Sequence, residues 1–121
     1  MKHDLAELFK HSDGIIDYPA FAVIFEEGQP GDSMFVLLEG RVTISIRGVD
    51  VWHLRDGEIF GEMALIDRRP RSASAIARTS VRVARIDEIG FMRLVQETPA
   101  FSIYVMRLMA KRLRALDDTI S

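Results

Sequence analysis

The chain has 121 residues, a net charge of −2 and no cysteine. A chain of this length forms one domain with its own core, and we predict a single domain over residues 1–121. The weak negative charge attracts no nucleic acid, and the lack of cysteine excludes disulfides, thiolate metal sites and thiol catalysis. No stretch reaches the roughly 18 apolar residues of a transmembrane helix, so we expect no membrane association and a cytoplasmic location.

The first segment, residues 1–14, has an amphipathic pattern. Leu5, Leu8 and Phe9 follow the i, i+3, i+4 spacing of one helical face, which predicts a short helix before Gly14. No basic region followed by an apolar run is present, so the segment is not a secretory signal peptide.

Residues 15–87 are rich in short apolar, often β-branched runs separated by Gly, Pro and Asp. The predicted strands include AVIF, MFVLLE, RVTISIR, VDVWHL, SASAIA and VRVARI. Strands at this spacing, with no helix-length pattern between them, predict an antiparallel sandwich, barrel or jelly roll. Pro30-Gly31 fits a type II turn with positive φ at Gly31, and Gly40 predicts a bulge or sharp bend.

Residues 88–121 return to a helical period. Pro99 indicates the first turn of a long helix, from about Ala100 to Asp117, with Thr98 as its N-cap. This helix has two apolar stripes. The first contains Phe101, Val105 and Leu108, and the second, with heptad spacing, contains Met106, Met109, Leu113, Leu116 and Ile120. One helix does not easily bury two stripes against one sheet, so we predict a homodimer; the alternative is that both stripes cover the β core.

The stretch GEMALIDRRPRSASAIA, residues 61–77, places Glu62 and Arg71 among small and apolar residues. Four interpretations compete. The two charges form a structural salt bridge across a hairpin, they belong to a catalytic centre, Arg68, Arg69 and Arg71 bind nucleic acid, or the stretch binds a phosphate.

The catalytic and nucleic-acid interpretations have little support. No spacing fixes a second carboxylate beside Glu62, and the histidines His3, His11 and His53 are scattered. We therefore predict no enzyme activity, no catalytic residue and no metal site. Three arginines on an acidic chain, with no accompanying binding motif, also predict no nucleic-acid binding by the chain itself.

The phosphate interpretation gives both charged residues a function. Gly61 opens a short helical segment, whose first N–H groups favour an anion. Arg71 can offer a bidentate fork to phosphate oxygens, and Glu62 can accept a hydrogen bond from a sugar hydroxyl. A phosphate and a ribose together would satisfy both residues.

The residues FGEMALIDRRPRSASAIA resemble the phosphate-binding cassette of the cyclic nucleotide-binding domain family, in its bacterial cAMP-sensor form. The upstream VIFEEGQPGDSMFVLLEGRVTI resembles the leading strands of that family, and the match extends from about Tyr18 to the final helix. The resemblance implies an eight-stranded antiparallel, jelly-roll-like β-roll over residues 15–87, with its cassette at 60–77. An N-terminal helix over 1–14, a short cassette helix and C-terminal helices over 88–121 complete the implied fold.

By this resemblance, the backbone N–H groups of Gly61 and Ala64 lie near the phosphate and sugar. Glu62 would accept from the ribose 2′-hydroxyl, and Arg71 would bind the cyclic phosphate. The remaining implied site residues are Ser72 and the backbone N–H of Ala73 beside the phosphate, Met63 and Leu65 facing the roll or its lining, and Arg112 stacked over the base.

The implied ligand is cAMP, although Ser72 also permits cGMP, and no cofactor is expected. The implied activity is that of a sensor whose C-terminal helices close over the base and signal to an unknown downstream protein. The start at Met1 favours a stand-alone sensor over a fragment of a transcription regulator. The remaining alternative is a ligand-free dimerisation module.

One position departs from the family pattern. Members often carry glycine after Tyr-Pro-Ala, whereas this chain has Phe21. Positive φ is unfavourable for phenylalanine, so we expect a different turn here, with Phe21 packed on a neighbouring residue.

Overall fold

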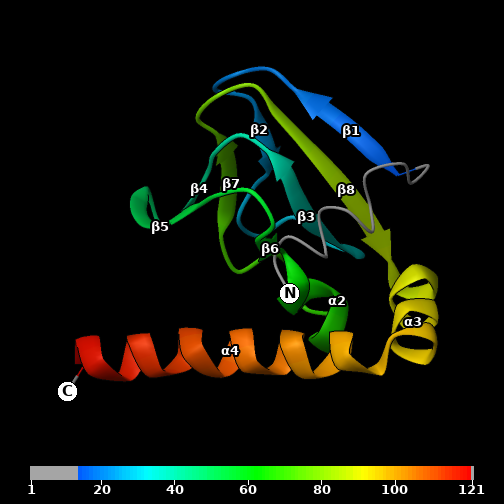
Figure 1. Cartoon of the computed structure of the whole chain (residues 1–121). Helices are drawn as coiled ribbons and strands as arrows, with labels where there is room; N and C mark the ends of the chain where they lie inside the picture. The colour runs from blue at the N-terminus through cyan, green and yellow to red at the C-terminus, as the bar shows by residue number, and fades with distance from the viewer. Residues whose placement is uncertain (1–13, 121) are drawn as a thin grey trace. The chain divides into compact units, whose positions relative to one another are not determined.

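The computed structural model describes residues 14–120, so the helix predicted over residues 1–14 lies almost entirely outside the described residues. The described residues contain eight strands and three helices (Figure 1). The strands are β1 (Ile15–Tyr18), β2 (Val23–Phe25), β3 (Ser33–Glu39), β4 (Val42–Ile46), β5 (Val49–Leu54), β6 (Ile59–Phe60), β7 (Ser74–Ala77) and β8 (Val81–Asp87). The helices are α2 (Glu62–Asp67), α3 (Glu88–Glu97) and α4 (Pro99–Ile120).

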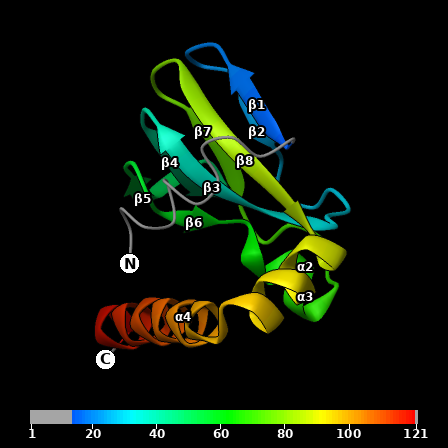
Figure 2. The same ribbon diagram turned by 45° about the vertical axis from the view of Figure 1, so that its right-hand side comes forward.

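The chain divides into two compact units, the first ending at Glu88 and the second beginning at Ile89. The first unit is built from two four-stranded antiparallel sheets, with strand orders β1-β8-β3-β6 and β2-β7-β4-β5. Figure 2 shows β1, β8 and β3 side by side in the first of these sheets. The predicted antiparallel β-roll is confirmed, and all six quoted strand segments contain strands.

The core of the roll lies between the two sheets. It forms because apolar side chains from both sheets point inward and lose contact with water. The buried cluster draws on every strand from β2 to β8 and consists of Phe25, Phe35, Leu37, Val42, Ile44, Leu54, Phe60, Ala75, Ala77, Val81 and Val83.

Of the two backbone conformations predicted at glycines, one is confirmed and one is wrong. Gly40 adopts φ 103° after β3, and the β3–β8 register shifts between Leu37 and Glu39, so the predicted irregularity is confirmed. Gly31 is not among the residues with positive φ, so the predicted type II turn is wrong. The reason for a glycine at position 31 is steric and belongs to the site described below.

The expectation for Phe21 is also wrong. Phe21 adopts φ 71°, and its side chain is 73% exposed rather than packed on a neighbour. The backbone explains why the turn keeps this geometry. Ala22 N donates to Pro19 O at 3.2 Å, and Phe21 N donates to Ala77 O at 2.7 Å, which ties the turn to the end of β7.

Phe21→Gly is expected to stabilise the protein by about 0.5–1 kcal/mol. An L-residue in the left-handed region costs about 1–2 kcal/mol, and the greater unfolded-state entropy of glycine cancels only part of that gain. Urea denaturation measures the change, and Phe21→Ala, which keeps the strained Cβ, is the control and should leave stability nearly unchanged. Equal stability of the glycine variant and the wild type would show that the exposed ring makes contacts that offset the strain.

The second unit consists of most of α3 and all of α4. The helix predicted from Pro99 is confirmed and begins at that residue. Phe91 of α3 and Phe101 of α4 pack edge to face, with ring centroids 5.8 Å apart. On α3, Ile89 and Met92 are exposed.

The two apolar stripes of α4 differ in exposure. In the first stripe Phe101 and Val105 are buried, and Leu108 is half-buried. In the second stripe Met106 is 56% and Leu113 63% exposed, whereas Met109 is half-buried. The last two positions of that stripe, Leu116 and Ile120, lie outside the residues whose side chains are described. No helix in the described part of the chain has the length and apolar character needed to cross a membrane.

Candidate ligand-binding site

The cassette stretch folds as a strand, a tight turn and a short helix. β6 ends at Phe60, Gly61 takes φ 75°, and α2 begins at Glu62 (Figure 1). Glycine suits this N-cap position because it adopts positive φ without strain. The helix ends at Arg68, whose own φ is 59° and whose N–H donates to Ala64 O. The predicted short helix opened by Gly61 is confirmed.

Arg71 follows α2 in a loop that is held by the β2–β3 turn. Its N–H donates to Gln29 O, and its carbonyl accepts from Gly28 N, both at 2.8 Å. These two bonds turn the side chain inward, where only 6% of Arg71 remains exposed. There Nη1 donates to Gly61 O at 2.8 Å, and Nη2 lies 3.4 Å from Ser33 Oγ.

The third nitrogen of this guanidinium group, Nε, has no hydrogen-bond partner. Within the described residues, Arg71 Nε is the one buried side-chain nitrogen or oxygen atom that makes no hydrogen bond. A buried unpaired donor costs roughly 1–3 kcal/mol, so such atoms are rare in folded proteins. Arg71 therefore presents a buried, charged donor for which the protein provides no acceptor.

The surroundings of Arg71 compensate its charge incompletely. Burial lowers the pKa of Arg71 from its ordinary value, and the nearby charge of Arg85 lowers it further. Asp32 and Glu62 act in the opposite direction. Asp32 is largely exposed and also forms an ion pair with Arg85 at 3.0 Å. An anion bound beside Arg71 would supply the missing compensation.

The other predicted site residues near Arg71 have mixed exposure. Glu62, at the first position of α2, is only 3% exposed, and Ala64 is buried beside it. Met63 is 42% exposed, so its side chain does not pack in the core. Ser72 is exposed, and Ala73 is partly buried against the core cluster.

Two further sequence assignments concern Leu65 and Arg112. Leu65 is buried and is not part of the core cluster of the roll. Arg112 lies on α4, in the second unit, and is half-buried. Its proposed contact with a base remains a prediction.

The hairpin that the structural salt-bridge interpretation requires is not formed. Glu62 begins α2 and Arg71 follows that helix, so the intervening residues are helical and loop residues rather than paired strands. The nucleic-acid interpretation is weakened at Arg68, because its Nη2 forms an ion pair with Glu88 Oε1 at 2.9 Å.

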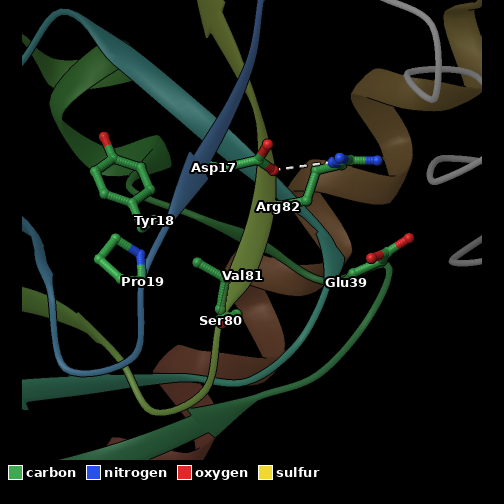
Figure 3. A pocket seen from close by; sticks show the side chains of 7 residues that line it. All are labelled: Asp17, Tyr18, Pro19, Glu39, Ser80, Val81 and Arg82. Atoms are coloured by element: carbon green, nitrogen blue, oxygen red, sulfur yellow. Dashed lines mark hydrogen bonds and ion pairs between the residues drawn. The ribbon is translucent and has the colours of Figure 1, made fainter.

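A separate cavity of about 400 Å³ lies at the surface of the β1–β8 pair (Figure 3). Arg82 Nε donates to Asp17 Oδ1 there at 2.9 Å, and this bond, the charge of Asp17 and that of Glu39 raise the pKa of Arg82. The guanidinium group of Arg82 is therefore already paired with Asp17. The lining is Asp17, Tyr18, Pro19, Glu39, Ser80, Val81 and Arg82. Among the described residues, no group of three or more histidines and carboxylates could hold a metal ion.

Three residues of the Arg71 environment were missed by reasoning from the sequence, namely Phe25, Gly31 and Ser33. Phe25 stacks on the guanidinium group, Gly31 leaves room for it, and Ser33 lies at Nη2. All three fall within the upstream stretch that carries the family resemblance. That stretch indicated strands and turns, but no local signal linked it to Arg71.

Comparison with known proteins identifies the class of this β-roll. Residues 15–98 match the family model described as "Cyclic nucleotide-binding domain". The match covers more than half of the chain, so this chain belongs to the cyclic nucleotide-binding domain family.

Individual relatives agree with this assignment. The chain is 45% identical over 82 residues to the "cAMP-dependent protein kinase regulatory subunit" of Aspergillus fumigatus, an alignment that covers 66% of this chain and 20% of the relative. It is 29% identical over 111 residues to the "CRP-like cAMP-activated global transcriptional regulator" of Mycobacterium tuberculosis, covering 88% of this chain and 50% of that protein.

The fold agrees with that of a solved relative. The crystal structure of the Thermus thermophilus Catabolite Activator Protein superposes with a TM-score of 0.81 at 29% identity, covering 96% of this chain and 55% of that one. The chain thus spans between a fifth and about half of the length of these relatives.

Proposed function

We propose that this chain is a sensor that binds a cyclic nucleotide, cAMP in preference to cGMP, and that it has no catalytic activity. The observation that carries the proposal is Arg71 Nε, a buried cationic donor without an acceptor. A cyclic phosphate is a compact anion that would accept from it. Two of the similar proteins, the kinase regulatory subunit and the transcriptional regulator, are named for cAMP, which favours that ligand.

The remaining site residues would serve the rest of the nucleotide. Glu62 would accept from the ribose 2′-hydroxyl, and the N–H groups of Gly61, Ala64 and Ala73 would lie along the phosphate and sugar. Ser72 would add a hydroxyl donor, Met63 would contact the ligand from α2, and Arg112 would cover the base. A guanine could also use Ser72, which is why cGMP remains the second candidate.

The signal would arise from the C-terminal helices. A ligand shifts a conformational equilibrium only by the difference between its affinities for the two states. A micromolar site provides about 8 kcal/mol in total, and a differential of a few kcal/mol is enough to close a marginally stable helical lid over the base. The closed state would then be recognised by a downstream protein.

Titration calorimetry with cAMP, and separately with cGMP, tests the proposed ligand. We expect one site with micromolar or tighter affinity for cAMP and weaker affinity for cGMP. Tighter cGMP binding would reverse the base preference. The absence of both heat and a thermal shift with either nucleotide, on folded protein free of copurified nucleotide, would contradict the sensor function and return Glu62 and Arg71 to a structural role.

We also propose that the chain forms a homodimer through the exposed stripe of α4. Met106 and Leu113 are large apolar residues at heptad spacing and are both more than half exposed, which favours pairing with a second copy.

Met106→Lys combined with Leu113→Lys is expected to raise the dimer dissociation constant at least about 100-fold, because each buried unpaired charge costs more than about 1.4 kcal/mol. Sedimentation velocity measures the change. Arg107→Ala combined with Lys111→Ala, two exposed positions outside the stripe, is the matched control and should leave the dimer intact. A dimer that survives the lysine substitutions would show that the stripe is not the interface.

A further inference from the structure

We propose that Phe25 is a positioning residue of the phosphate site: its ring fixes the plane of the Arg71 guanidinium group, and with it the direction of the Nε–H bond that the phosphate would accept. This inference rests on the proposed function and adds a residue and a mechanism to it. It concerns only side chains of the first unit.

The contact between the two groups is close and buried. The Cζ atom of Arg71 lies 4.2 Å from the centroid of the Phe25 ring, within the range of a cation–π interaction. Phe25 is 8% and Arg71 6% exposed, so water screens this contact weakly. The more distant Phe35 ring lies 5.7 Å from the same Cζ atom.

The Phe25 ring is itself held in place. It stacks on Phe35 and Phe60, with centroid separations of 5.8 and 6.0 Å, and those two rings stack on each other at 5.3 Å. A ring fixed by two buried neighbours cannot easily tilt, because close packing leaves no volume for it. The guanidinium group therefore rests on a rigid aromatic surface.

Two glycines enclose the guanidinium group further. A Cβ atom at Gly31 would lie 2.5 Å from Arg71 Nε and 2.8 Å from its Cζ. At Gly61 a Cβ atom would lie 2.8 Å from Nη1 and 3.2 Å from Phe25 Cε2. A side chain at either position would displace the guanidinium group, so the two glycines and Phe25 form a slot that fits this planar group.

The slot leaves the Nε–H group without a protein acceptor. Nη1 is bonded to Gly61 O and Nη2 lies near Ser33 Oγ, whereas Nε has no partner. If the ring were replaced by a flexible side chain, the guanidinium group could tilt and the Nε–H direction would no longer be fixed. Arg71 would remain charged, but the hydrogen bond from its Nε–H to phosphate would weaken.

Phe25→Met tests the proposal, because methionine fills nearly the same volume without a ring. We expect cAMP affinity, measured by calorimetry, to fall about tenfold, because a guanidinium group that is free to tilt loses part of its charged hydrogen bond to phosphate. Ile44→Val is the control: Ile44 belongs to the same core cluster, has the same 8% exposure and lies on β4. Its affinity should stay within about twofold of the wild type at a comparable loss of stability.

A second measurement needs no ligand. In the NMR spectrum of the free protein, the Arg71 Nε–H proton, assigned by its absence in Arg71→Lys, is expected upfield of the other arginine Nε–H protons because it lies near the face of the ring. Phe25→Met should remove this shift, and Ile44→Val should keep it.

The outcomes separate the two proposals. Wild-type protein that binds neither cAMP nor cGMP overturns the proposed function, and this inference with it. Wild-type binding together with unchanged affinity in Phe25→Met overturns the positioning role alone. An affinity loss equal to that of Ile44→Val, or an Nε–H shift that persists without the ring, also overturns it.

Discussion

Arg71→Ala is expected to raise the dissociation constant for cAMP at least about 100-fold and to leave the dimer largely intact. The substitution removes Arg71 Nε, which among the described residues is the one buried side-chain donor without a protein acceptor, together with the charge of Arg71. Hydrogen bonds to charged groups contribute about 1.5–3 kcal/mol each, so their loss to a phosphate corresponds to this change in affinity. Calorimetry gives the affinity, and sedimentation velocity gives the oligomeric state.

Arg69→Ala is the matched control for this prediction. Arg69 is an exposed arginine of the same loop, and its backbone N–H donates to Asp67 Oδ1, an interaction that survives the substitution. Its affinity should remain within about twofold of the wild type, because an exposed charge outside the site contributes little. If Arg71→Ala instead bound cAMP within about threefold of the wild type and mainly lost stability, Arg71 would be a structural residue.

Gly40→Ala is expected to destabilise the protein by about 3 kcal/mol or more. A Cβ atom there would lie 2.5 Å from Ser80 O and 2.8 Å from Thr79 Oγ1, and the backbone φ is 103°. Steric overlap with a carbonyl adds to the cost of a backbone conformation that L-residues rarely adopt. In urea denaturation the midpoint should fall by about 1–2 M.

Gly48→Ala separates the cost of positive φ from the cost of steric overlap. Gly48 also has positive φ, 78°, but no atom lies within 4 Å of a Cβ built there. Its substitution should cost only about 0.5–1 kcal/mol, the cost of positive φ reduced by the lower unfolded-state entropy of alanine. Equal losses of stability in Gly40→Ala and Gly48→Ala would contradict this. They would show that the backbone near Gly40 relaxes and that steric overlap with Ser80 and Thr79 adds no cost.

Much of the roll could be predicted because its signals are local. Alternating apolar residues and glycine breaks mark the strands, and the proline at position 99 marks the start of α4. Two short features of the fold were harder to predict from the sequence. β6 has only two residues, too few for any periodic pattern, and the turn at Phe21 is fixed by its hydrogen bond to Ala77, which is distant in sequence.

The site was predicted only in part, because some of its contacts join residues that are distant in sequence. Glu62 and Arg71 could be selected because charged residues are conspicuous in an apolar stretch. Phe25 and Gly31 belong to a segment that is distant in sequence, and they meet Arg71 only once β2 has paired with β7. The sequence assigned Gly31 to a turn because a Pro-Gly pair is a common turn signal. In the structure, the lack of a side chain at Gly31 instead leaves space for the Arg71 guanidinium group.

The central claim is that Arg71 Nε holds a cyclic phosphate, and a crystal structure of the protein with saturating cAMP tests it most directly. The predicted result is a phosphate oxygen about 2.7–2.9 Å from Arg71 Nε, with the guanidinium group still stacked on Phe25. A nucleotide bound elsewhere, or a nucleotide in the roll with Nε still lacking an acceptor, would contradict it.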